Sequence, residues 1–151
     1  MKRTTFAWVA AVAALVVAAG PAAAGQDGEP DHGMPGTGEI LPHPGPDGLI
    51  WIPDWIGNGG AVTGGASPNG LPVVVTVGCQ GGSDGAGEVR VTYRPEYGDT
   101  TPVKFTVPCP ADTVGRGSAV VTAEQGRAFY VGVLTSAPDV HWGLTVAQPE
   151  S

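Results

Sequence analysis

The chain has 151 residues, with fourteen acidic against seven basic side chains and a formal net charge of −7. Neither this charge nor the scattered Lys and Arg residues resemble the basic footprint of nucleic-acid-binding proteins, so we expect no nucleic-acid partner. The same charge disfavours docking onto anionic membranes.

Residues 1–24 are typical of a secretory signal peptide. Lys2 and Arg3 give the positive start, Phe6–Ala19 is an unbroken apolar run, and Ala22–Ala24 offers a small-residue cleavage pattern. The run is shorter than the roughly 20 residues of a transmembrane helix, and an uncleaved N-terminal anchor is the alternative. Cleavage after residue 24 leaves five basic and fourteen acidic residues. We therefore expect a secreted, extracellular protein that does not associate with the membrane after signal cleavage.

Residues 25–70 are rich in glycine and proline. They contain 13 Gly, 7 Pro and six acidic residues, and no Lys or Arg. Such a composition buries too little apolar surface to offset the entropy of ordering, which predicts a flexible acidic linker. His32 and His43 in this linker fit no metal-coordination pattern, so we expect no metal and no other cofactor.

An apolar island, residues 49–56, interrupts this linker with the sequence LIWIPDWI. Pro53 argues against a continuous helix. The island is most simply an edge strand or strap packed on the following domain. Two other interpretations are an exposed aromatic platform made by Trp51 and Trp55, and a self-association patch. The glycine-rich residues 57–60 and 64–70 are expected to form a second flexible link.

Residues 71–151 have the pattern of an all-β domain. Six β-branched runs alternate between apolar and polar residues and are separated by turn residues: 71–77, 88–94, 103–107, 119–123, 128–134 and 140–147. Gly126 lies in a short turn that predicts a hairpin between the fourth and fifth runs. We therefore expect a small antiparallel β-sandwich of six to seven strands.

Cys79 and Cys109 are the two cysteines of the chain, and in a secreted protein they predict one structural disulfide. Closing a loop of this length stabilises the fold by roughly 3–4 kcal/mol in the chain-entropy model. An immunoglobulin domain is disfavoured, because its disulfide brackets the core tryptophan and here Trp142 follows both cysteines.

Several groups of polar residues have the side chains of catalytic or metal sites, but none of them predicts such a site. His141 and Asp139 could form a triad with Ser118 or Ser136, but there is no G-x-S-x-G motif and alternation turns His141 towards solvent. Glu96 and Asp99 lie in a loop without a surrounding cleft. Asp84 and Glu88 alone supply too few oxygens for calcium. We therefore expect no catalytic residue and no enzyme.

The remaining hypothesis is extracellular binding or surface interaction with a cell-wall polysaccharide or a protein. The candidate binding surface consists of Trp51, Trp55, Tyr97, Tyr130 and His141, with Thr92 and Arg94 on an open sandwich face. Its sharpest form is a carbohydrate-binding module. A self-associating wall or matrix component is the main alternative, and a hydrolase ranks last.

The chain resembles small secreted β-sandwich proteins of streptomycetes and related actinobacteria. The resemblance is carried by the signal sequence, the Gly/Pro-rich spacer, VTVGC at 75–79, FTVPCP at 105–110 and WGLTV at 142–146. It implies an extracellular location and brings no activity, cofactor or ligand with it.

Overall fold

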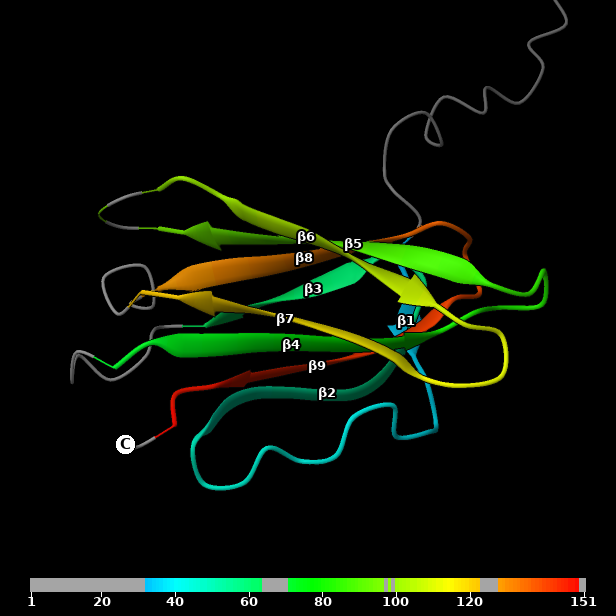
Figure 1. Cartoon of the computed structure of the whole chain (residues 1–151), viewed down its shortest axis with the longest axis horizontal. Helices are drawn as coiled ribbons and strands as arrows, with labels where there is room; N and C mark the ends of the chain where they lie inside the picture. The colour runs from blue at the N-terminus through cyan, green and yellow to red at the C-terminus, as the bar shows by residue number, and fades with distance from the viewer. Residues whose placement is uncertain (1–31, 64–70, 97, 99, 123–127, 150–151) are drawn as a thin grey trace, which may run out of the picture.

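The computed structural model describes residues 32–63, 71–96, 98, 100–122 and 128–149, which form two antiparallel sheets of nine strands in total (Figure 1). The predicted signal peptide and residues 25–31 lie outside the described residues. Sheet A has the order β1 (Met34–Pro35), β2 (Gly48–Ile56), β9 (His141–Ala147), β4 (Val73–Gln80) and β7 (Gly115–Val121). Sheet B has the order β3 (Gly59–Thr63), β8 (Phe129–Thr135), β5 (Gly87–Pro95) and β6 (Val103–Cys109). Among the described residues, no helix is long and apolar enough to span a membrane.

Alternation along each strand builds the core between the sheets. The fully buried side chains come from every second position, as in β4 with Val73, Val75 and Val77. Tyr93 and Phe129 contribute the aromatic centre of sheet B, with ring centroids 4.8 Å apart. The six predicted runs correspond to β4 to β9, and the predicted all-β antiparallel sandwich is confirmed.

The chain before residue 71 also contributes strands, although its composition predicts a linker. β2 contains the apolar island and pairs with β9, so that Trp51 lies opposite Thr145 and Trp55 opposite Trp142. Pro53 falls where the register shifts, a position at which a strand does not need its missing N–H. Gly59 and Gly60, expected in a flexible link, begin β3 and pair with β8. The prediction of a linker from composition is wrong here, because a segment with few apolar residues can form a strand when it pairs with a strand of an existing sheet.

The predicted hairpin between the fourth and fifth runs is wrong. β7 belongs to sheet A and β8 to sheet B, so the chain crosses between the sheets there. The turn residues 123–127 lie outside the described residues. β7 turns Gly117 inward, where a Cβ would come within 2.7 Å of Val107 on β6. The missing side chain at Gly117 therefore lets β6 of sheet B approach β7 of sheet A closely. The prediction was wrong because alternation within a strand does not show which sheet the strand joins.

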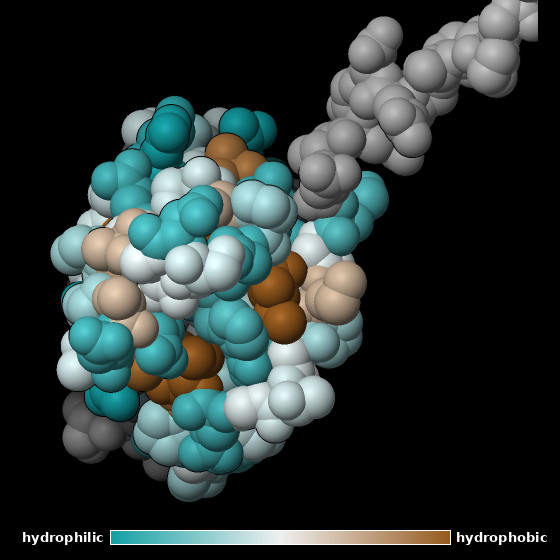
Figure 2. All heavy atoms as spheres, turned by 90° about the vertical axis from the view of Figure 1, so that its right-hand side faces the viewer, coloured by the Kyte–Doolittle hydropathy of each residue, from teal (hydrophilic) through white to brown (hydrophobic). Residues whose placement is uncertain are grey.

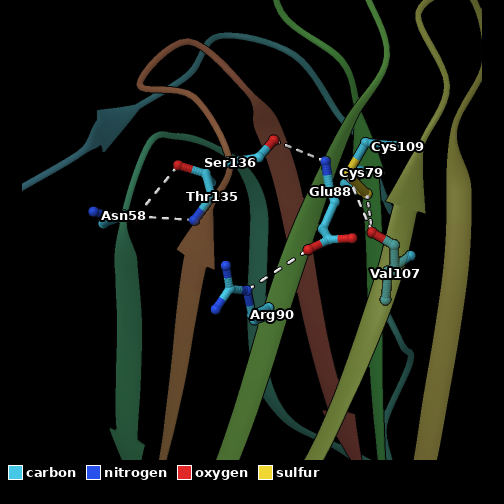
Figure 3. Close-up of polar contacts among 8 residues, drawn as sticks. All are labelled: Asn58, Cys79, Glu88, Arg90, Val107, Cys109, Thr135 and Ser136. Atoms are coloured by element: carbon cyan, nitrogen blue, oxygen red, sulfur yellow. Dashed lines mark hydrogen bonds and ion pairs between the residues drawn. A yellow bond between two sulfur atoms is a disulfide. The ribbon is translucent and has the colours of Figure 1, made fainter.

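The predicted disulfide is confirmed, and it joins the two sheets. Cys79 on β4 and Cys109 on β6 have their Cα atoms 5.0 Å apart. Figure 3 shows the bond next to Val107 of β6. Trp142 is the cross-strand neighbour of Cys79 and is fully buried, and its Nε1 donates to the carbonyl of Gly57 at 2.7 Å. A disulfide fits folding in an oxidising compartment.

Candidate binding site

The residues of the predicted binding surface lie on two opposite sides of the sandwich. Trp51 and His141 project from the outer face of sheet A. Trp55 and Tyr130 line one groove at the β3 side of sheet B. Tyr97 lies outside the described residues. The residues predicted as one binding surface therefore lie on two faces, which alternation within single strands could not show.

Trp51 is held by a segment that we call the strap, residues 36–47, which runs from β1 to β2 (cyan in Figure 1). Trp51 Nε1 donates to the carbonyl of Leu41 at 3.0 Å, and the ring of His43 packs edge-on at a centroid distance of 4.8 Å. Trp51 keeps 38% of its surface exposed. Its indole N–H and its contact with the His43 ring thus help to hold the strap.

The strap covers a pair of glycines on sheet A. Gly78 and Gly143 are cross-strand neighbours on β4 and β9. A Cβ on Gly78 would come within 2.9 Å of Leu41, and one on Gly143 within 3.1 Å of Ile40. Leu41 is almost fully buried, although it lies outside the core between the sheets. The outer face of sheet A is therefore partly closed.

His141 pairs with Asp54, a residue that no motif in the sequence marks. The Nδ1 atom of His141 lies 2.9 Å from Asp54 Oδ1, and the Asp54 side chain is 3% exposed. The backbone N–H of Gly38 donates to Asp54 Oδ2 at 2.9 Å, and a Cβ on Gly36 would overlap this carboxylate. The one signal in the sequence is an acidic residue inside an apolar island.

The residues of the considered triad each face a different partner. The hydroxyl and backbone N–H of Ser83 donate to Asp139, and these hydrogen bonds lower the pKa of Asp139. Ser136 Oγ accepts the backbone N–H of Glu88 at 2.9 Å (Figure 3). Ser118 lies on β7, opposite Thr76 of β4. Within the described ranges, no group of three or more His, Cys, Asp or Glu residues could hold a metal ion.

Tyr130 lies across the outer face of sheet B. Gly60 and Gly132 are cross-strand neighbours on β3 and β8, and a Cβ on either would come within 2.9 Å of the Tyr130 side chain. The phenol ring therefore rests on a pair of glycines, and Tyr130 keeps 40% of its surface exposed. Because the glycines offer no side chains to tilt the ring, it forms a platform on the sheet.

The surface around this ring is the sheet-B face, which we define by these outward side chains: Val62, Glu88, Arg90, Thr92, Arg94, Lys104, Thr106, Tyr130 and Leu134. The pairing registers place all of them on the side opposite the buried residues of the same strands. Arg94 lies directly opposite Tyr130, and Arg90 lies opposite Leu134. This face therefore combines one aromatic ring, two exposed apolar side chains, three cations, one carboxylate and two hydroxyls.

Two shallow grooves meet at Leu134, which is 55% exposed. The first, of about 300 Å³, runs along β3 between Tyr130, Val62 and the edge of Trp55. The second, of about 390 Å³, lies over β5 and β6 between Arg90, Thr92, Lys104 and Thr106. Together they border residues of all four strands of sheet B, although Arg94 lines neither of them.

The loop-bearing end of the sandwich has a different surface. A groove of about 440 Å³ lies there between β1, the corner at Asn58 and residues 135–138. Asn58 Oδ1 accepts the backbone N–H of Thr135 at 2.9 Å, which closes the wall of this groove (Figure 3). Figure 2 shows this end as mainly hydrophilic, with small and separate apolar patches. The extended combination of aromatic and polar groups is therefore found on the sheet-B face.

No protein-family model and no curated protein matches this chain. Among solved structures, it is similar to the N-terminal CBM22-1–GH10 modules of endo-1,4-β-D-xylanase 10B from Clostridium thermocellum, complexed with xylohexaose. The sequence identity is 12% and the TM-score is 0.45, over 65% of this chain and 22% of that chain. The matched part thus spans less than a quarter of that structure's length.

Proposed function

We propose that this protein is a secreted, non-enzymatic binding module that holds an extended carbohydrate on the sheet-B face. The observation that carries the proposal is the Tyr130 ring, which lies on the Gly60–Gly132 pair with its other side open to solvent. The predicted signal peptide and the disulfide support the extracellular location.

The chemistry of the face suits a sugar polymer. An aromatic ring offers an apolar surface on which the C–H face of a sugar ring can pack, while neighbouring polar groups meet its hydroxyls. Thr92 and Thr106 supply such groups beside the second groove. The two grooves are shallow and both border Leu134, which favours a chain over an enclosed small molecule.

A depletion assay tests this function. Protein of residues 25–151 is mixed with chitin, cellulose or purified cell wall, pelleted, and measured in the supernatant. We expect retention by at least one polymer, and Tyr130→Ala should weaken it about 5–10-fold, because one aromatic stacking contact contributes about 1 kcal/mol. Trp55 lines the first groove, so soluble oligosaccharides of a retained polymer should also change the tryptophan fluorescence.

The matched control is Val120→Ala, which removes an exposed apolar side chain from the outer face of sheet A. Its retention should equal that of the parent protein. Urea unfolding of both variants checks that they remain folded. If Tyr130→Ala remains folded and is retained as well as the parent protein, the proposed site is wrong.

Self-association through residues 49–56 has little support from this geometry. Ile50, Ile52 and Trp55 pack against the core, and Trp51 is bonded to the strap. The apolar island is thus used within the molecule, and we do not propose it as a contact between copies.

A further inference from the structure

Most of the cationic side chains that the structure describes lie on one face of the molecule. Four Lys or Arg side chains lie in the described ranges, and three of them, Arg90, Arg94 and Lys104, project from the sheet-B face. The fourth, Arg116, lies on β7 of sheet A. We infer that the ligand of the sheet-B face is an anionic polysaccharide with about one carboxylate per sugar. This inference rests on the proposed function and specifies its ligand.

The spacing of the cations favours a sparsely charged polymer. Arg90 and Arg94 are four residues apart on β5, or about 13 Å along the strand. Lys104 lies opposite Thr92, midway between them on the next strand. Positive charges therefore recur about every 6–7 Å along the strand direction, against about 1.7 Å per charge in duplex DNA. A polyuronate places its charges one sugar apart, which suits this wider spacing.

The charges on this face are only partly compensated within the protein. Glu88 lies 3.6 Å from Arg90, as Figure 3 shows, and it is the one acidic side chain among the outward positions of β3, β5, β6 and β8 in the described residues. In the same part of the chain, neither Arg94 nor Lys104 forms an ion pair. The face is therefore positive on a molecule whose formal charge is −7, which directs an anionic ligand to this side.

Arg94 and Tyr130 link the charge to the stacking site. They are direct cross-strand neighbours, on β5 and β8. A sugar ring packed on Tyr130 would place a carboxylate substituent within reach of the Arg94 guanidinium, which binds carboxylates with two parallel hydrogen bonds. One uronate unit could thus occupy both side chains at once, and the next units could reach Lys104 and Arg90.

The test compares polygalacturonate with its fully methyl-esterified form, which has the same backbone without the charge. Dissociation constants are measured for the parent protein, the Arg94→Gln/Lys104→Gln double variant, Tyr130→Ala and the control Arg116→Gln. We expect the acidic polymer to bind at least tenfold more tightly than the ester. The double variant should lose at least tenfold on the acidic polymer, and Arg116→Gln should lose less than twofold. Raising the salt from about 20 to about 200 mM should weaken the acidic complex several-fold, because exposed charges are screened.

The failures of the inference and of the proposed function give different results. Equal, salt-independent binding of both polymers that Tyr130→Ala weakens would retain the proposed function and overturn the anionic ligand. Preference for single-stranded DNA over polygalacturonate at the same salt would also overturn the inference. No binding to either polymer, together with no retention on chitin, cellulose or cell wall, would overturn the proposed function itself.

Discussion

Asp54 is an acidic residue in an apolar segment, and its role in holding the strap cannot be recognised from the residues beside it in the sequence. Its carboxylate is nearly fully buried, yet it lies between the backbone N–H of Gly38 and the ring of His141. Buried carboxylates are stable when such partners meet their oxygens. The alternation of apolar and polar residues correctly predicted that His141 points away from the core, but its partner Asp54 lies 87 residues earlier in the chain. No local pattern links positions so far apart, so the pair could not be found from sequence.

Replacing Asp54 should weaken the attachment of the strap. Asp54→Ala leaves the Gly38 N–H without its acceptor and the imidazole of His141 without its partner, which should lower the free energy of unfolding by about 1–3 kcal/mol. Urea unfolding monitored by tryptophan fluorescence measures this loss. Glu39→Ala is the control, because Glu39 is exposed on the same strap. Equal stability of the two variants would show that Asp54 does not hold the strap.

At the scale of elements, the two glycine pairs explain how side chains cover the outer faces of both sheets. Glycine inside a strand weakens it unless another group approaches closely. Gly78 and Gly143 admit the strap on sheet A, whereas Gly60 and Gly132 admit the Tyr130 ring on sheet B. Gly132 and Gly143 are visible in the sequence as interruptions of predicted strands and Gly78 directly follows one, whereas Gly60 lies in a segment whose composition predicts a link. What lies on them is not visible, because it comes from a distant segment on sheet A and from a side-chain orientation on sheet B.

A side chain at Gly143 should displace the strap. In Gly143→Val, the new Cβ would come within 3.0 Å of the Pro53 carbonyl and 3.1 Å of Ile40. We expect a loss of about 1–3 kcal/mol in unfolding free energy, which is typical of overpacking, and faster proteolysis within residues 36–47. Val120→Ala provides the control, because it changes an exposed side chain on the same outer face without adding volume. A strap that stays protected from protease in Gly143→Val would contradict this account.

At the scale of the whole molecule, local periodicity predicted more than composition did. The six runs after residue 71 were located within a few residues because alternation is a property of each strand alone. The distribution of strands between the sheets and the membership of β1 to β3 depend on tertiary pairing. The candidate site followed the same rule. Tyr130 and Arg94 were singled out from sequence, but their pairing across β5 and β8 and their separation from Trp51 and His141 required the sheet order.

The pairing of β2 and β3 gives the last prediction, that residues 71–151 alone do not form a stable domain. Without β2, the fragment lacks the apolar side chains that pack on the core from that strand, Leu49, Ile50, Ile52 and Trp55. Full burial of such a side chain stabilises by about 1.5–3 kcal/mol, and even the partial burial of these four adds up to several kcal/mol, a large part of the roughly 5–15 kcal/mol of a typical domain. Trp142 also loses Gly57, the acceptor of its indole N–H.

Urea unfolding and near-ultraviolet circular dichroism of residues 32–151 and 71–151 compare the two lengths. The longer chain should unfold cooperatively. The shorter one should have a solvent-exposed Trp142 emission and a broad transition or none. If both unfold at similar urea concentrations, the strands after residue 71 suffice for stability, and β2 and β3 are an addition to a completed sandwich.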